Sequence, residues 1–190
     1  MNIVLIRHGA TDMAGRFCGH SDPELNAAGE AEAIRIAEEV SRLGAGRIYS
    51  SDLRRASQTA AAIAQRTGIA VSYLTGLREI DFGEWEGLAW QQIELRFPCE
   101  ADRWLREFPL RGAPGGETYA SFAARVDAAI ATMLRETAGV TAAVVTHGGV
   151  MRHALTRFFG FSDGEAWAKT ALYGAMVIAA NPAQCCEAQR

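Results

Sequence analysis

The chain has 190 residues, of which 49% are hydrophobic and 22% charged, and its formal net charge is −3 at pH 7. This size and composition predict one globular domain over residues 1–190. The weak negative charge disfavours nucleic acids and anionic membranes as partners, although a local group of arginines could still bind a small anion. No apolar run approaches the ~20 residues that span a bilayer and no leader pattern is present, so we expect a cytoplasmic protein.

The four cysteines show neither a CxxC pair nor the spacing of metal ligands: Cys18, Cys99, Cys185 and Cys186. We therefore expect no metal, no cofactor and no structural disulfide, with the last two cysteines in a frayed tail. The sequence leaves the assembly open, with a homodimer as one option.

Strand and helix patterns alternate along the chain. Asn26, Asp52 and Thr118 stand where helices begin, because their side-chain oxygens can accept the free backbone N–H groups there. In chain order we predict a strand at 3–6, a helix at 27–43, a strand at 47–50, a helix at 53–67, a strand at 69–74, helices at 90–97 and 100–108, a helix from 118, a strand at 140–146, a helix at 150–159 and a strand at 175–180. This alternation indicates the α/β class, with a mainly parallel sheet covered on both faces.

Two of the apolar strands end in the same way. Residues 3–6 lead into Arg7-His8-Gly9, and residues 142–146 lead into His147-Gly148-Gly149. Open α/β sheets bind ligands outside the carboxyl ends of their strands, and glycine lets a ligand approach the backbone closely. The two ends therefore predict a binding site rather than packing alone.

A pair of arginines, Arg54-Arg55, begins the second helix. Positive side chains oppose the helix dipole at this end, and a bound anion would remove the conflict. A solvated basic pair is the alternative, and the residues alone do not decide between the two.

A carboxylate-rich loop follows at 78–87, and it contains Glu79, Asp81, Glu84 and Glu86. One of these groups could donate a proton in catalysis, but spacing does not say which. Four aromatic side chains nearby could stack on a substrate, although we expect at least two of them to pack a cap over the core: Trp85, Trp90, Trp104 and Phe108.

Four short motifs occur in a fixed order: Leu5-Ile6-Arg7-His8-Gly9, Leu53-Arg54-Arg55-Ala56, Leu77-Arg78-Glu79 and Thr146-His147-Gly148-Gly149. Together they resemble the histidine phosphatase superfamily, in its phosphoglycerate mutase-like branch. The resemblance covers nearly the whole chain, and it implies a three-layer α/β/α sandwich with a mostly parallel sheet.

The resemblance also implies roles for individual residues. His8 would be the nucleophile that accepts the phosphoryl group, and Glu79 would act first as acid and then as base. Arg7, Arg55 and His147 would bind the phosphoryl oxygens, with His147 counted among the catalytic groups; the arginine directly before alanine is the family's ligand. Thr11 and Gly148 complete the expected substrate-binding set.

The activity so implied is a metal-independent phosphomonoesterase that acts on a small phosphate ester through a phosphohistidine. The runs 15–22 and 113–118 are similar to small α-ribazole phosphatases of cobalamin synthesis, which suggests α-ribazole 5′-phosphate as a substrate. Two features depart from the family pattern: Ala10 replaces a glutamate, and no asparagine stands near Ala14 in a loop about two residues short. The missing asparagine bears on phosphate affinity rather than on the nucleophile.

Two other functions stay open. A phosphoglycerate mutase would return the phosphoryl group to the substrate, but the chain lacks the segments that make such enzymes longer. A non-catalytic module that binds phosphorylated ligands would not need both His8 and Glu79.

Overall fold

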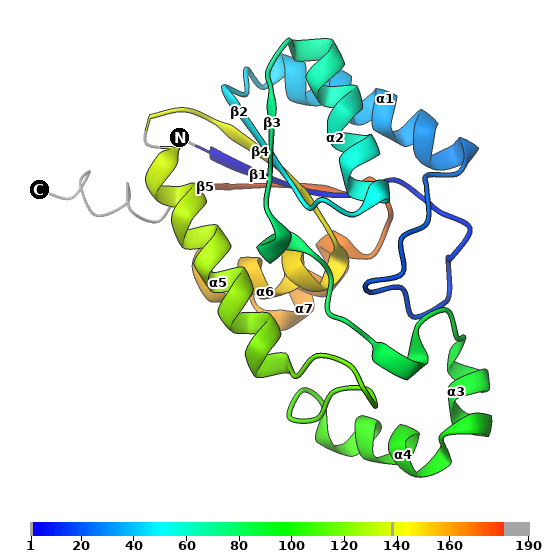
Figure 1. Cartoon of the computed structure of the whole chain (residues 1–190). Coiled ribbons are helices and arrows are strands. Elements are labelled where there is room, and N and C mark those ends of the chain that lie inside the picture. The colour runs from blue at the N-terminus through cyan, green and yellow to red at the C-terminus, as the bar shows by residue number, and fades with distance from the viewer. Residues whose placement is uncertain (1, 138, 181–190) are drawn as a thin grey trace, which may run out of the picture.

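The computed structural model describes residues 2–137 and 139–180, which fold around a five-stranded sheet (Figure 1). The strands lie in the order β3-β2-β4-β1-β5. Their bounds are β1 Asn2–Arg7, β2 Arg47–Ser50, β3 Val71–Tyr73, β4 Ala142–Thr146 and β5 Met176–Ala180. Only β5 pairs antiparallel, against β1, so the prediction of a mostly parallel sheet is confirmed.

Helices cover both faces of this sheet. Alternate residues of β1 point to opposite sides, as the two-residue period of a strand requires. Val4 and Ile6 pack with α1 (Ala27–Arg42) and α2 (Arg54–Thr67), whereas Ile3 and Leu5 pack with α5 (Tyr119–Glu136) and α6 (Gly148–Phe159). The three-layer α/β/α sandwich is therefore confirmed.

Two of the three predicted helix starts have the expected cap. The Asn26 side chain accepts the Gly29 N–H at 3.0 Å, and the Thr118 hydroxyl accepts the Ser121 N–H at 3.2 Å. The prediction for Asp52 was wrong, because α2 begins at Arg54 without a side-chain cap. The Asp52 carboxylate instead accepts two hydrogen bonds from the Arg78 guanidinium, and such a charged bidentate pair is stronger than a cap bond.

The segment between β3 and α5 extends beyond the sheet and contains only short helices (Figure 1). They are η1 Thr75–Leu77, η2 Gly83–Trp85, α3 Trp90–Arg96 and α4 Pro98–Glu107. Pro98 begins α4 instead of breaking the chain before it, since proline is tolerated in the first turn of a helix. Trp85 and Ile93 are fully buried there and form a small hydrophobic cluster separate from the two sheet layers.

One further helix, α7 (Asp163–Thr170), was not predicted from the sequence. Its start carries a capping box in which Ser162 and Glu165 satisfy each other's backbone N–H groups. Across the part of the chain that the structure describes, no helix has the length and apolar character to cross a membrane. Cys18 and Cys99 are free thiols, whereas the expectation for Cys185 and Cys186 lies outside the described residues.

Candidate active site

The two His-Gly strand ends meet because β1 and β4 are neighbours in the sheet. Arg7 pairs with Thr146 in the parallel register, and the His8 N–H donates to the Thr146 carbonyl at 3.0 Å. The rings of His8 and His147 are consequently only 5.0 Å apart, centroid to centroid. Residues that are 139 positions apart in the chain thus share one edge of the sheet.

The His8 side chain is buried and its protonation is set by its neighbours. Its Nδ1 lies 2.7 Å from the Gly9 carbonyl oxygen, which can only accept, so Nδ1 carries the proton and Nε2 keeps its lone pair. The Arg55 Nε–H points at that lone pair from 3.2 Å. Burial, followed by the charges of Arg55 and Arg7, lowers the pKa of His8 to about 3. A neutral imidazole with an unprotonated Nε2 is the form that can act as a nucleophile.

Arg55 is buried beside His8, and its terminal nitrogens are held by backbone oxygens. They donate to Ser21 and Gly19 at 2.7 Å each, and to Cys18 at 3.3 Å. Arg54, in contrast, is exposed and pairs with Glu24. The structure therefore separates the two arginines, with Arg55 beside His8 as the resemblance implied. Arg55 does not line the cavity, and it contacts His8 at Nε2, the nitrogen that would react.

Glu86 holds the loop that receives Arg55. Four backbone N–H groups donate to its carboxylate, at distances between 2.8 and 3.1 Å: Gly19, His20, Ser21 and Phe82. Burial acts to raise the pKa of Glu86, but these hydrogen bonds together lower it. Glu86 therefore fixes the carbonyl groups that position Arg55, a function that its place in an acidic loop did not reveal.

His147 and Arg7 each have one buried side-chain nitrogen that is unpartnered among the residues described, and the His147 nitrogen is a donor when the Ser51 hydroxyl donates to the other ring nitrogen. His147 Nε2 lies 2.9 Å from the Ser51 hydroxyl, which leaves Nδ1 without a partner. Arg7 donates through Nη1 to the carbonyls of Thr170 and Ala171 and lies over the Tyr173 ring, which leaves Nε without a partner. Burial first, and then Arg55 and His8, hold the pKa of His147 well below its usual range.

Of the four acidic residues in the loop at 78–87, Glu79 is the one that lines the cavity. Backbone N–H groups of Gly149 and Ile80 donate to its two oxygens at 2.9 and 3.1 Å. A Cβ atom at residue 149 would lie 2.2 Å from Glu79 Oε1, so glycine is required for this close approach. The geometry thus selects the carboxylate that spacing alone could not select.

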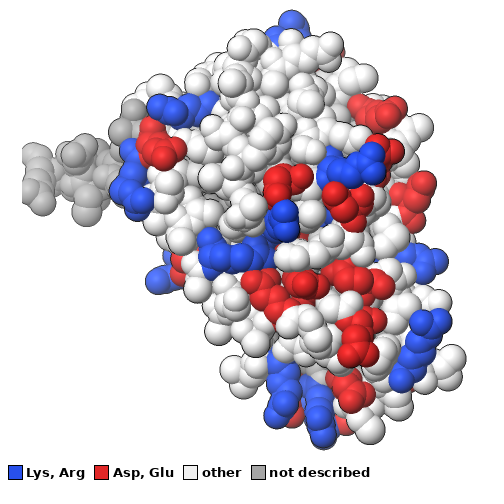
Figure 2. All heavy atoms as spheres, viewed as in Figure 1, with Lys and Arg blue, Asp and Glu red and all other residues white. Residues whose placement is uncertain are grey.

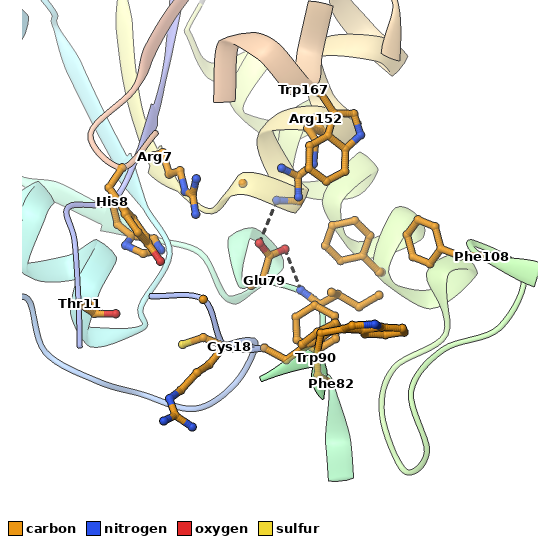
Figure 3. A pocket seen from close by; sticks show the side chains of 18 of the residues that line it. Arg7, His8, Thr11, Cys18, Glu79, Phe82, Trp90, Phe108, Arg152 and Trp167 are labelled. Atoms are coloured by element: carbon orange, nitrogen blue, oxygen red, sulfur yellow. Dashed lines mark hydrogen bonds between the residues drawn. The ribbon is translucent and has the colours of Figure 1, made fainter. Parts of the chain in front are cut away.

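One cavity of about 570 Å³ opens in front of these groups (Figure 3). One end is polar and is lined by Arg7, His8, Thr11, Glu79, Gly148, Gly149 and Arg152. The other end is aromatic and is lined by Phe17, Phe82, Trp90, Trp104, Phe108, Tyr119, Phe122 and Trp167. Trp90, Trp104 and Phe108 therefore face the cavity. The prediction that at least two of these aromatic residues pack is confirmed, because Trp85 is buried in the small cluster and Trp90 and Trp104 pack against it.

Sequence reasoning missed three residues of the cavity that come from the last third of the chain: Arg152, Trp167 and Tyr173. Arg152 carried a usable signal, because it stands four positions after Gly148 and so on the same face of α6. Trp167 lies on the unpredicted helix α7 and Tyr173 in the turn before β5. Within residues 2–137 and 139–180, no group of three or more His, Cys, Asp or Glu side chains could hold a metal ion.

Comparison with known proteins identifies the class to which this fold and site belong. The family model described as "Histidine phosphatase superfamily (branch 1)" matches residues 3–181. The protein therefore belongs to the histidine phosphatase superfamily, and it is an enzyme of the phosphoric monoester hydrolase class.

The names of individual relatives refer to different phosphate esters. Phosphoserine phosphatase 1 of Hydrogenobacter thermophilus is 30% identical over 169 residues, which cover 88% of this chain and 80% of the relative. "Probable phosphoglycerate mutase GpmB" of Salmonella paratyphi C is 34% identical over 179 residues, or 90% of this chain and 80% of the relative. The solved α-ribazole phosphatase of Shigella flexneri superposes with a TM-score of 0.80 at 25% identity, over 88% of this chain and 84% of that one.

Proposed function

We propose that this protein is a metal-independent phosphomonoesterase that transfers the phosphoryl group of a small metabolite to His8 and then to water. One observation carries the proposal. A neutral His8 with an unprotonated Nε2 shares one end of the sheet with two buried nitrogens, Arg7 Nε and His147 Nδ1, that have no partner among the described residues. The nucleophile and the groups that can bind an anion thus lie together at the carboxyl ends of β1 and β4.

The phosphoryl group would be held by charge and by directed hydrogen bonds. A phosphate monoester carries nearly two negative charges at neutral pH, and Arg7 Nε and His147 Nδ1 can each donate to one of its oxygens. Arg55 adds a second fixed positive charge beside His8. Thr11 and Gly148 line the same end of the cavity, where the hydroxyl and the backbone N–H can complete the set. Such fixed charge stabilises the negative charge that the equatorial oxygens carry in the transition state.

In the first step, the His8 Nε2 lone pair attacks phosphorus, the Nε2–P bond forms and the ester P–O bond breaks. The departing alkoxide is a poor leaving group, so Glu79 in its acid form donates a proton to it. The Nδ1 proton stays on His8 and is donated in a hydrogen bond to the Gly9 carbonyl oxygen, which orients the ring throughout.

In the second step, a water molecule attacks the phosphohistidine, and ionised Glu79 takes up its proton. The N–P bond breaks, inorganic phosphate leaves, and His8 and Glu79 return to their starting forms. The two backbone N–H groups on Glu79 keep its carboxylate in place for both transfers.

Substitution of the nucleophile tests this proposal directly. His8→Ala should lower turnover of p-nitrophenyl phosphate by about 10⁴-fold or more, as for the removal of other essential catalytic groups. The wild-type protein, quenched during turnover, should carry an acid-labile, alkali-stable phosphoryl group that mass spectrometry assigns to His8. His20→Asn is the matched control, because His20 does not line the cavity. Near-normal activity of His8→Ala would refute the scheme.

The substrate is proposed at two levels. The first is a small phosphate ester, and the second is α-ribazole 5′-phosphate in cobalamin biosynthesis. The aromatic end of the cavity and the superposition on an α-ribazole phosphatase support the second level, since a planar base can stack on aromatic side chains. Comparison of kcat/KM for α-ribazole 5′-phosphate, phosphoserine and other phosphorylated metabolites decides it.

Mutase activity is the second candidate function, because one relative at 34% identity is named as a phosphoglycerate mutase. It is tested by conversion of 3- to 2-phosphoglycerate with and without the bisphosphate. A module that only binds phosphorylated ligands is the third, and any turnover of p-nitrophenyl phosphate that needs His8 excludes it.

A single domain over residues 1–190, a cytoplasmic location, a homodimer and the absence of nucleic-acid partners stay predictions. On the face drawn in Figure 2, the described Lys and Arg side chains lie in separate groups among Asp and Glu. The described part of this face therefore offers no continuous basic surface of the kind that a long polyanion requires.

A further inference from the structure

Arg152 is a cation in the cavity for which the proposed reaction has no role. Its guanidinium lies 3.9 Å from the centre of the Trp167 ring. Its side chain makes no hydrogen bond or ion pair with any residue that the structure describes. Burial lowers the pKa of Arg152, and the charge of Glu79 opposes this effect. A partly buried guanidinium whose N–H groups have no acceptor is unfavourable, so its retention in the cavity points to a ligand.

The position of Arg152 separates it from the phosphoryl site. A Cβ atom at Gly148 would lie 3.2 Å from Arg152 Nη1 and 3.6 Å from Arg7 Nε, so the two guanidiniums flank this glycine. The charges that lower the pKa of His8 come from Arg55 and Arg7, and Arg152 is not among them. Figure 3 shows Arg152 on the side of Arg7 that faces away from His8, next to Trp167 and toward Phe108.

The orientation of Arg152 suits a planar anion. Trp167 covers one face of the guanidinium, which fixes its plane and leaves its N–H edge free to donate. Two parallel N–H groups match the two oxygens of a carboxylate, and this match favours arginine over lysine at such sites. Glu79 keeps its own hydrogen bonds to backbone N–H groups and forms no ion pair with Arg152.

We propose that Arg152 is a second anion subsite that binds a carboxylate on the leaving part of the substrate. The inference rests on the proposed phosphatase function of the same cavity, and it narrows the substrate to phosphate esters of hydroxy acids that also present an apolar or aromatic group. The leaving part of α-ribazole 5′-phosphate carries no carboxylate, so the two substrate classes are alternatives that the comparison of kcat/KM values decides.

The test uses two aryl phosphates that differ in charge but hardly in shape. These are 4-carboxyphenyl phosphate and its neutral amide, 4-carbamoylphenyl phosphate, together with the corresponding 3-substituted pair. Wild-type kcat/KM should favour the carboxylate by about tenfold or more, the size expected for a charged hydrogen bond, in at least one pair. Arg152→Gln should abolish this preference while it changes kcat/KM for the amide by less than about threefold, and Arg152→Lys should restore it in part.

Arg157→Gln is the matched control, because Arg157 is exposed on the same helix and does not line the cavity. Equal losses on the acid and the amide would overturn the subsite, since Arg152 would then act on the phosphoryl group or on Glu79. The absence of any wild-type preference would overturn it as well.

The affinities of the acid and the amide for the His8→Ala variant test the subsite without any need for turnover. Calorimetric titration of the same acid and amide into His8→Ala and into His8→Ala/Arg152→Gln should show the same carboxylate preference and its loss. If wild-type protein hydrolyses neither ester, the proposed function fails, whereas a carboxylate preference in these titrations would still support the subsite. Equal affinity of His8→Ala for acid and amide would refute it.

Discussion

The two ends of the cavity are built in different ways. At the polar end, His8 and His147 stand at the ends of two paired strands, and Glu79 and Arg55 are held by hydrogen bonds to backbone groups. At the aromatic end, Trp90, Trp104 and Phe108 belong to the short helices beyond the sheet or to the loop that follows. Trp104 contacts Phe108 through its ring, and Trp90 and Trp104 both contact Trp85. Backbone hydrogen bonds fix geometry more tightly than contacts between side chains.

This difference predicts how the two ends divide their tasks. A reacting group must be placed within a fraction of an ångström, which the sheet edge and its backbone partners provide. Substrate selection needs shape and apolar area, which side chains on short helices can supply and change independently. Changes at the polar end should therefore alter kcat, and changes at the aromatic end should alter KM.

The largest effect is expected for Glu79→Gln. The amide cannot protonate the leaving oxygen, so kcat for alkyl phosphates should fall by about 10² to 10⁴-fold. Aryl phosphates, whose leaving groups are more acidic, should slow much less. Steady-state rates with serine phosphate and p-nitrophenyl phosphate measure the contrast, and similar losses on both would remove Glu79 from the acid role.

Glu86→Gln should have a smaller effect that still appears in kcat. The amide group keeps one acceptor oxygen for the four backbone N–H groups, so the loop that holds Arg55 should shift. A displacement of this kind should lower kcat/KM by about 10- to 100-fold. Glu84→Gln, two residues away and exposed, is the control and should match the wild type. An active Glu86→Gln variant would show that Arg55 does not depend on this carboxylate.

Trp104→Leu tests the aromatic end. The Trp104 ring lies 4.6 Å from Phe108 and lines the cavity, so its loss should raise KM for aryl phosphates by about three- to tenfold with little change in kcat. Inhibition by inorganic phosphate should stay the same, because phosphate occupies only the polar end. Leu105→Ala, at a neighbouring exposed side chain, is the control. A fall in kcat instead would show that the two ends are not independent.

The smallest effect concerns stability in acid. In the unfolded chain, the imidazole of residue 8 takes up a proton below about pH 6.5, whereas folded His8 stays neutral down to about pH 3. The unfolded state therefore binds more protons in this window, and the free energy of unfolding should fall by up to about 1.4 kcal/mol per pH unit as pH decreases. Urea unfolding between pH 7 and 5 measures this slope, and His8→Asn should reduce it by the share of His8 while the share of the buried His147 remains. Equal slopes for both proteins would contradict a buried neutral His8.

Local signals in the sequence predicted much of this molecule. The apolar runs that become β1 and β4, and the caps at Asn26 and Thr118, depend on residues close to each other in the chain. The family motifs then indicated His8 and Glu79, which both line the cavity.

The features that the sequence did not reveal depend on contacts between distant segments. Asp52 leaves its expected cap for Arg78, which is 26 residues away, and Glu86 accepts N–H groups from residues 65 to 67 positions earlier. Arg152 and Trp167 meet only because α6 packs on α7. No periodicity or cap signal encodes such contacts, since they arise from tertiary packing.

The sheet order also has a consequence for the order of events during synthesis. Strand β1 lies between β4 and β5, whose residues all come after position 141. Its backbone has no ladder partners while a ribosome is still making the first two thirds of the chain, and long-range pairing of this kind closes slowly. The reaction centre is therefore completed near the end of folding. After dilution from denaturant, turnover should recover more slowly than the circular dichroism signal of the helices. The recovery of turnover would then report the pairing of β1 with β4 and β5.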